Sequence, residues 1–196
     1  MIPELSGSYW NNRYLTNDFG WDVGQVSTPL KEYIDQLQDK TLRILIPGAG
    51  NSYEAEYLTN LGFGNVFVCD FAPQALSNLK QRCPAIKTEN LIASDFFELG
   101  LAPFDLILEQ TFFCAINPTL RQTYFRKMHA LLKPGGKLVG LLFNDALNAD
   151  KPPFGGNAQE YRAYFRNLFS IHTYAACHNS IKPREGRELF INLVKT

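Results

Sequence analysis

Two glycines and one aspartate have the spacing of a nucleotide-cofactor site. Gly48 and Gly50 lie in a turn at the end of an apolar run, and Asp70 ends the next apolar run, 20 residues beyond Gly50. Glycines leave no side chain between backbone and ligand, and a carboxylate at this place can accept hydrogen bonds from both hydroxyls of a ribose. The pattern predicts a site for a cofactor that contains adenosine. A Gly-x-Gly turn that is only a loop is the alternative.

The residue at position 53, just after this turn, helps to decide which adenosine-containing cofactor the site would bind. A dinucleotide fingerprint needs a third glycine at the position of Tyr53, where the helix passes close to the strand and faces a pyrophosphate. Tyr53 therefore argues against a nicotinamide dehydrogenase. Two glycines and an acid suit S-adenosylmethionine, which carries a ribose and an amino-acid tail but no phosphate. Asn51 or Ser52 is expected to cap the helix that follows.

Alternating apolar strands and helices are expected to position these residues. The predicted strands cover 41–47, 66–69, 90–93, 104–108, 137–143, 170–176 and 188–195, and the main predicted helices cover 28–37, 53–58, 74–82, 118–132 and 158–168. This order is typical of a Rossmann-like α/β fold with a seven-stranded, mostly parallel sheet, helices on both faces and an antiparallel C-terminal hairpin. The chain, 1–196, is expected to form a single domain.

Polar and aromatic residues follow two more of these strands. Ser94, Asp95 and Phe96 come after the third strand, where Asp95 can reach an adenine amino group and Phe96 can pack on the ring. The alternative is that Asp95 only caps its loop. After the fourth strand, Glu109 and Gln110 are expected to bond the cofactor tail. Phe112 and Phe113 then form an apolar wall for the substrate; core packing could explain these two phenylalanines, but not the polar pair.

Residues 1–28 are dense in aromatic side chains and contain both tryptophans of the chain. They could form a lid over the cofactor, where aromatic faces pack on a sulfonium cation, or a flap that covers an edge of the sheet. The loop 144–157, with Pro152-Pro-Phe154, is expected to be a functional cover. Arg184 and Arg187 are expected to be solvated, unless one of them contacts an anionic substrate.

Composition excludes several classes of function. Lys+Arg and Asp+Glu are equal at 19 each, so the chain has no basic field for nucleic acid. It has neither an apolar run long enough for a membrane span nor a signal peptide at its start, which predicts a cytoplasmic protein. The four cysteines and three histidines lack the spacing of metal ligands, so neither a metal nor a disulfide is expected. A monomer or weak dimer is expected.

With these residues in place, the chain resembles the class I S-adenosylmethionine-dependent methyltransferases. More narrowly, it resembles the thiopurine methyltransferase superfamily and, within it, the plant thiol and halide methyltransferases. The general likeness lies in Ile46–Gly50, Asp70 and Leu132–Gly136. The specific likeness lies in Phe104-Asp-Leu-Ile-Leu-Glu-Gln-Thr-Phe-Phe-Cys-Ala-Ile116, which is close to the branch pattern FDLIFDYVFFCAI, and in Trp10, Tyr14, Trp21 and Pro152–Phe154.

The resemblance implies a role for each matched residue. Trp10, Tyr14 and Trp21 would wrap the methionine and sulfonium end of the cofactor, and Gly48, Ala49 and Gly50 would contact its tail. Asp70 with Phe71 would bind the ribose, Ser94, Asp95 and Phe96 the adenine, and Glu109 and Gln110 the region of the tail. Five positions depart from the family: Tyr14 replaces a tryptophan, Ala49 a cysteine, Glu109-Gln110 an Asp-Tyr pair, and Phe154 a tyrosine.

Methyl transfer is an in-line displacement that needs an aligned nucleophile and little water. A thiolate or halide is already a good nucleophile, so no dedicated base is expected. Trp21, Phe112, Phe113 and Phe154 are expected to position a small thiol, bisulfide or halide. The alternatives are a methyltransferase for another small metabolite, such as a thiopurine-like heterocycle or a metalloid, and a module that binds S-adenosylmethionine without catalysis.

Overall fold

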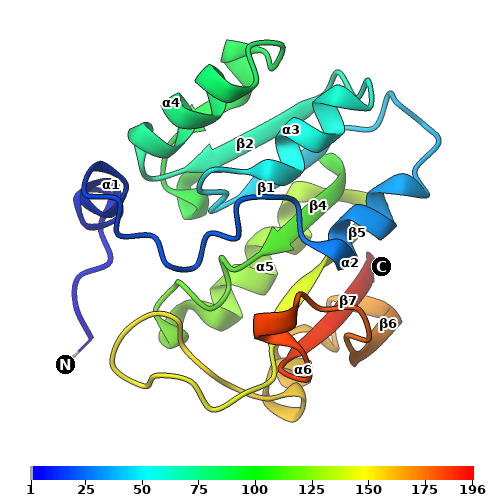
Figure 1. Ribbon diagram of the computed structural model, residues 1–196. Helices are drawn as coiled ribbons and strands as arrows, with labels where there is room; N and C mark the ends of the chain where they lie inside the picture. Colours follow the sequence, from blue (N-terminus) through cyan, green and yellow to red (C-terminus); the bar gives the residue numbers. More distant parts are fainter. Residues whose placement is uncertain (1) are drawn as a thin grey trace. The chain divides into compact units, whose positions relative to one another are not determined.

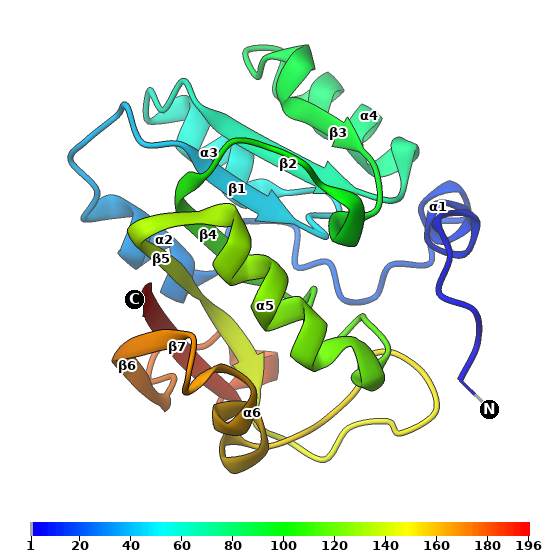
Figure 2. The same ribbon diagram turned by 180° about the vertical axis from the view of Figure 1, so that it is seen from behind.

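A computed structural model describes residues 2–196 of the chain. These residues group into two compact units, Glu4–Gly100 and Leu101–Thr196, the second of which includes residues 2 and 3. Figures 1 and 2 show that strands and helices alternate in both units. The expectation of one domain over 1–196 therefore stays a prediction, and each unit is described by itself.

The unit Glu4–Gly100 is built on three parallel strands in the order β3-β2-β1. The strands are β1 (Ile44–Pro47), β2 (Val66–Asp70) and β3 (Leu91–Ala93), and the helices are α1 (Gly7–Leu15), α2 (Thr28–Asp35), α3 (Tyr53–Asn60) and α4 (Pro73–Arg82), with short 3₁₀ turns at η1 (Thr88–Asn90) and η2 (Phe96–Glu98). Proline near the first position starts α2 and α4, since its fixed φ suits a helix start and its missing N–H costs nothing there.

The unit Leu101–Thr196 pairs four strands in the order β4-β5-β7-β6. The strands are β4 (Phe104–Gln110), β5 (Leu132–Phe143), β6 (Phe169–Ala176) and β7 (Glu188–Lys195), the helices are α5 (Arg121–Leu131) and α6 (Ala158–Phe165), and 3₁₀ turns lie at η3 (Pro118–Leu120) and η4 (Lys182–Arg184). β4 and β5 run parallel, whereas β7 is antiparallel to both β5 and β6. The predicted C-terminal hairpin is confirmed.

The full strand order, β3-β2-β1-β4-β5-β7-β6, confirms the predicted seven-stranded, mostly parallel sheet. Within the unit Glu4–Gly100, α3 packs on β2 (Figure 1), and within the unit Leu101–Thr196, α5 packs on β5 (Figure 2). Most boundaries lie within three residues of the expected ones. The largest difference is that the turn expected at Lys133–Gly136 lies within β5, which starts at Leu132. A register irregularity between Phe104 and Leu106 accommodates it, and Gly135 takes a φ of 76° that L side chains rarely adopt.

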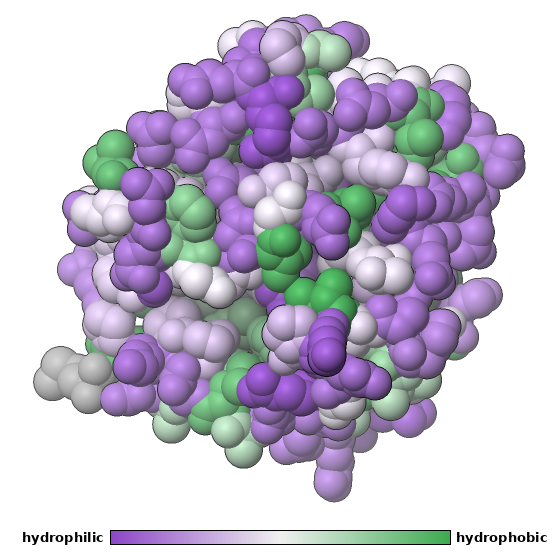
Figure 3. All heavy atoms as spheres, viewed as in Figure 1, coloured by the Kyte–Doolittle hydropathy of each residue, from purple (hydrophilic) through white to green (hydrophobic). Residues whose placement is uncertain are grey.

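Apolar residues fill the strands and leave few large ones outside. All four cysteines are free and buried. The large exposed hydrophobic residues are widely separated in the sequence: Leu15, Val23, Leu61, Leu120 and Ile171. The face in Figure 3 accordingly shows hydrophobic residues as small patches in a mostly hydrophilic surface. Within residues 2–196, no helix has the length and apolarity to span a membrane. Cytoplasmic location and a monomer or weak dimer stay predictions.

Candidate active site

In the unit Glu4–Gly100, the glycine turn is closed by the aspartate that the sequence singled out. Asp70 Oδ2 accepts a hydrogen bond from the Gly50 N–H at 2.8 Å, and Oδ1 accepts one from the Ala72 N–H at 2.7 Å. Burial raises the pKa of Asp70, and these two N–H donors oppose that rise. Gly48 and Gly50 have φ values of 55° and 54°, as a turn of this shape requires. Asp70 therefore shapes the turn, and its contact with a ribose stays a prediction.

Tyr14 of α1 lies directly over this turn. A Cβ atom on Gly50 would be only 2.5 Å from the Tyr14 hydroxyl oxygen, so a side chain at position 50 would collide with it. Tyr14 is buried with Ala72 and Ala75, and Trp10, Phe19 and Trp21 pack around it. Its pKa is raised, first by burial and then by the nearby Asp70 charge. The hydroxyl therefore stays protonated at neutral pH.

Hydrogen bonds fasten the aromatic segment to the turn and to α4. Asp22 Oδ2 accepts from Asn51 Nδ2 at 2.5 Å and from the Tyr53 hydroxyl at 3.3 Å. Asn11 Oδ1 accepts from the Gln74 N–H at 2.9 Å, in the first turn of α4. Trp10 and Trp21 meet edge to face, with their ring centroids 5.7 Å apart. Trp10, Tyr14 and Trp21 thus form one cluster at the glycine turn, while their role as a lid stays a prediction.

Ser52 behaves differently from the expectation. It is the N-cap residue of α3, but its side chain makes no capping hydrogen bond, because its φ of 48° turns it out of the usual extended cap conformation. The Asn51 side chain bonds Asp22 and Asn78 instead of capping. The Ser52 hydroxyl is buried and has no hydrogen-bond partner among residues 2–196. A polar tail of a cofactor beside the turn could supply that partner.

After β3, Asp95 makes the capping contact that the sequence predicted as the alternative to adenine binding. Asp95 Oδ1 accepts from the Phe97 N–H at 2.8 Å and thereby caps η2. Phe96 is buried and meets Phe97 edge to face, and the Ser94 hydroxyl lies 3.3 Å from the Asp95 carbonyl oxygen. Phe71 packs near Gly7 of α1. Contacts of these four residues with ribose or adenine stay predictions.

In the unit Leu101–Thr196, the buried Glu109 near the end of β4 accepts hydrogen bonds from the turn that follows this strand. Its side chain has no exposed surface; Oε1 accepts from the N–H groups of Phe112 at 2.8 Å and Phe113 at 3.0 Å, and Oε2 accepts from the Tyr124 hydroxyl. Burial raises the pKa of Glu109 to about 7. The sequence argument that packing could not explain this residue is therefore wrong: Glu109 holds the chain where it leaves β4.

The aromatic residues after β4 divide into two kinds. Phe113 is 1% exposed, with the rings of Tyr124 and Tyr161 each 5.0 Å away, and Phe154 is also 1% exposed. Phe112 and Gln110 are only partly buried. Packing within the unit explains Phe113 and Phe154 without any ligand. Phe112 and Gln110 keep accessible surface, and the proposed substrate or cofactor roles of all four stay predictions.

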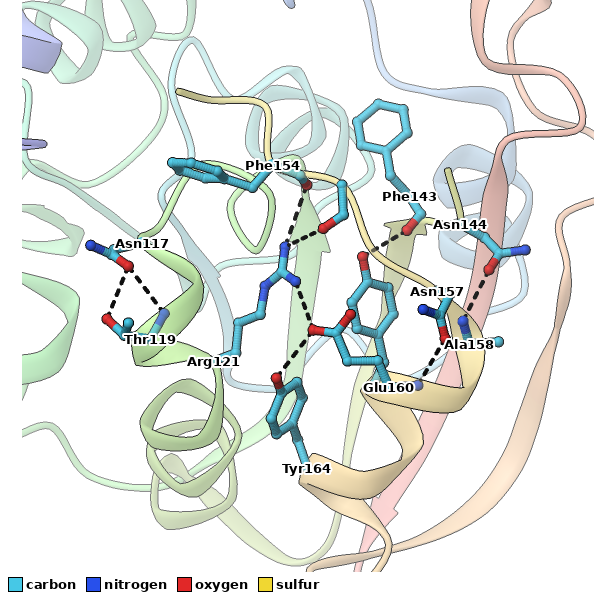
Figure 4. A network of polar contacts seen from close by, with 12 residues as sticks. Asn117, Thr119, Arg121, Phe143, Asn144, Phe154, Asn157, Ala158, Glu160 and Tyr164 are labelled. Carbon is cyan, nitrogen blue, oxygen red and sulfur yellow. Dashed lines mark hydrogen bonds and ion pairs between the residues drawn. The ribbon is translucent and has the colours of Figure 1, made fainter. Parts of the chain in front are cut away.

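An arginine that the sequence did not single out organises the loop 144–157 (Figure 4). Arg121 is 2% exposed at the start of α5. Its Nη1 pairs with Glu160 Oε1 of α6 at 2.9 Å, and its Nη2 donates to the carbonyl oxygens of Gly155 at 2.8 Å and Phe154 at 3.4 Å. The only sequence signal was a charge among the apolar positions of an amphipathic helix. The loop is thus tethered rather than free.

Arg184 corrects another expectation. It was expected to be solvated, but it is buried, with Nη1 3.5 Å from Glu188 Oε1 and its guanidinium carbon 5.7 Å from the Phe143 ring centroid. Arg187 does keep exposed surface, and it pairs with Asp145 at the start of the loop. Among residues 2–196, no group of three or more His, Cys, Asp or Glu side chains could hold a metal.

A family model described as "Thiopurine S-methyltransferase (TPMT)" matches residues 5–192. Probable thiol methyltransferase 2 of Arabidopsis thaliana is 27% identical over 193 residues, which cover 96% of this chain and 85% of that protein. Thiopurine S-methyltransferase of Acinetobacter baylyi is 22% identical and covers 85% and 87%.

Among solved structures, the 1,6-didemethyltoxoflavin-N1-methyltransferase of Burkholderia thailandensis, with S-adenosylhomocysteine bound, matches with a TM-score of 0.76 at 22% identity, over 97% of this chain and 87% of that chain. This likeness shows the fold. The family match extends over nearly the whole chain, and it includes the glycine turn with its closing aspartate. The chain therefore belongs to the thiopurine S-methyltransferase family of class I S-adenosylmethionine-dependent methyltransferases.

Proposed function

We propose that this methyltransferase transfers a methyl group to a small soft nucleophile, namely a thiol, bisulfide or halide. The observation that carries the proposal is the cluster of Trp10, Tyr14 and Trp21 at the turn closed by Asp70. Relatives named probable thiol methyltransferase 2 and thiocyanate methyltransferase 1, each 27% identical, support a soft acceptor.

The residues of the turn fit the cofactor. When bound, S-adenosylmethionine supplies the methyl group on a sulfonium cation. Gly48, Ala49 and Gly50 offer backbone without side-chain bulk, and the buried Ser52 hydroxyl offers a polar group that needs a partner. The aromatic faces of the cluster suit a cation that must be kept from water.

The titratable groups agree with catalysis by positioning. The Tyr14 hydroxyl is the polar group of the cluster that lies over Gly50, and its raised pKa keeps it protonated, so it is unsuited to accept a proton at neutral pH. Glu109 has a pKa of about 7, but both of its oxygens accept hydrogen bonds from its own unit. A thiolate or halide needs neither group, because it attacks without losing a proton.

For the acceptor side, the proposal assigns Phe112, Phe113 and Phe154 of the unit Leu101–Thr196 to an apolar environment for a polarisable atom. Phe112 keeps accessible surface and is the residue of the β4 turn best suited to touch an acceptor. The buried Phe113 and Phe154 would fix the shape of the wall. Apolar surroundings exclude water, and they thereby remove the hydration of the nucleophile's charge that would lower its reactivity.

The test is calorimetric titration with S-adenosylhomocysteine, followed on the same sample by turnover of S-adenosylmethionine with iodide, bisulfide and thiophenol. Binding together with turnover of at least one acceptor supports the proposal. Binding without turnover on any of them refutes the soft-acceptor assignment, and failure to bind refutes the cofactor role of the turn.

A heterocyclic thiol is the second candidate, because bacterial relatives at 21–23% identity are named thiopurine S-methyltransferase. Adding 6-mercaptopurine to the panel decides between the two. A kcat/KM for this acceptor above those for iodide, bisulfide and thiophenol would favour the heterocycle.

A further inference from the structure

Arg121 joins three parts of the unit Leu101–Thr196 through a single guanidinium group (Figure 4). It starts on α5, pairs with Glu160 of α6, and donates to two successive carbonyl groups of the loop, Phe154 and Gly155. The guanidinium carbon also lies 4.8 Å from the ring centroid of Phe113. One cation therefore contacts both phenylalanines that the proposed function assigns to the acceptor wall.

We propose that Arg121 is a positioning residue that sets acceptor selectivity by fixing the loop 144–157 and the Phe113 ring in one arrangement. The proposal rests on the proposed function, which assigns Phe113 and Phe154 to the acceptor side. Arg121 acts through these residues and need not touch the acceptor.

The loop is packed closely around this contact. A Cβ atom on Gly155 would lie 2.2 Å from the Leu147 nitrogen, and one on Gly156 would lie 2.3 Å from the Tyr161 hydroxyl. The backbone therefore passes close to other backbone at Gly155, which Arg121 contacts, and close to a ring at Gly156, which follows it. The Phe154 N–H donates to the Cys114 carbonyl at 2.7 Å, so a shift of the loop also pulls on the segment that carries Phe113.

The geometry requires arginine rather than any cation. A planar guanidinium can point one nitrogen at a carboxylate and another at two carbonyl oxygens, whereas an ammonium is a compact charge without this fork. Arg121 is buried, while the Glu160 side chain keeps 35% of its surface. Lysine at position 121 can keep the ion pair with Glu160, but it lacks the second nitrogen that donates to the two carbonyl groups.

The first measurement follows the loop itself. Hydrogen exchange of peptides over 144–157 is compared among the wild type, Arg121→Lys and Arg121→Met, in each case with the full chain. We expect exchange in the loop to rise by about tenfold or more in both Arg121 variants, with β2 (Val66–Asp70) unchanged. Gln122→Ala is the matched control, because Gln122 is the next residue of α5 and bonds Tyr164 of α6 but not the loop.

The second measurement is the ratio of kcat/KM for thiophenol to that for bisulfide. Partial unfolding removes active enzyme equally for both acceptors, so it leaves this ratio unchanged, whereas a displaced aromatic wall penalises the ring of thiophenol. A single contact between rings changes the ratio by up to about tenfold. We expect a fall of this size for Arg121→Lys and Arg121→Met, and a wild-type ratio for Gln122→Ala.

The outcomes separate the two proposals. Wild-type exchange in the loop of Arg121→Met overturns the inference, and so does an unchanged ratio when the loop exchanges faster. If the wild-type enzyme turns over none of iodide, bisulfide and thiophenol, the proposed function fails. The part of the inference that concerns acceptor selectivity then fails too. The exchange data still decide whether Arg121 holds the loop.

Discussion

Gly50→Ala tests the close approach of Tyr14 to the glycine turn. Two costs are expected. Alanine at a φ of 54° is strained by about 1–2 kcal/mol. Its Cβ atom would also lie 2.5 Å from the Tyr14 hydroxyl oxygen, and overpacking of this kind costs about 1–3 kcal/mol. The free energy of unfolding should therefore fall by roughly 2–5 kcal/mol.

A second substitution separates the two costs. The next atom near the new Cβ would be the Tyr14 ring carbon at 3.6 Å, an ordinary contact, so Tyr14→Phe removes the collision and leaves the φ strain. Gly50→Ala should then be more damaging in the Tyr14 background than in the Tyr14→Phe background by about 1–3 kcal/mol.

The assay is urea unfolding, without cofactor, of the wild type, Gly50→Ala, Tyr14→Phe and the double variant. Gly64→Ala is the control for the general effect of replacing a glycine, since a Cβ atom there has no neighbour within 4 Å. A coupling energy below about 0.5 kcal/mol would refute the placement of the hydroxyl over Gly50. A large loss in Gly64→Ala would instead show that the effect is not specific to the turn.

Three further predictions concern charged groups. The pKa of Glu109 is about 7 in the folded protein and 4.5 is its ordinary value, so the stability due to its protonation is present below pH 4.5 and is lost as pH rises through about 7. Glu109→Gln should remove this loss, which is about 3 kcal/mol, in unfolding experiments between pH 5 and 8. An equal dependence of the unfolding free energy on pH in both proteins would contradict this prediction. Asp70→Asn should weaken S-adenosylhomocysteine binding in calorimetry by about 10–100-fold, because an amide nitrogen cannot accept from the Gly50 or Ala72 N–H; unchanged affinity would show that the turn holds its shape without the carboxylate. Asp22→Ala should speed amide exchange around residues 19–25 and weaken the same binding by about 3–10-fold, since it frees Asn51 and Tyr53; faster exchange with full affinity would separate the aromatic segment from cofactor binding.

Local patterns predicted the elements well because each boundary has a local cause. Pro73 starts α4, and the apolar spacing of Ala75, Leu76 and Leu79 placed its buried face correctly. The glycine turn with Asp70 was enough to prefer S-adenosylmethionine over a dinucleotide, and the family match agrees with that preference and with an enzyme rather than a binding module.

Buried charges were the main failure. Glu109, Arg121 and Arg184 are each buried, and each is paired with a group from another element: Tyr124, Glu160 and Glu188 respectively. A charged residue type predicts exposure because an unpaired buried charge is costly. The partner that compensates the charge is 15 residues away in the sequence for Glu109 and 39 residues away for Arg121. For Arg184 the partner is only 4 residues away, but the chain turns between them.

The glycines show why such partners are hard to see in advance. A Cβ atom on Gly140 of β5 would lie 2.4 Å from the Glu109 Cβ, its neighbour in the β4–β5 register, just as one on Gly50 would meet Tyr14. In a strand a glycine usually weakens pairing, so its presence indicates that something needs the space. Gly50 and Gly140 thus each mark a close approach, but only the folded chain shows which group approaches. At Gly140 the approaching atoms are the Cβ and the backbone carbonyl oxygen of Glu109. The buried Glu109, whose carboxylate bonds the turn after β4, and the small residue beside it therefore form a single structural requirement.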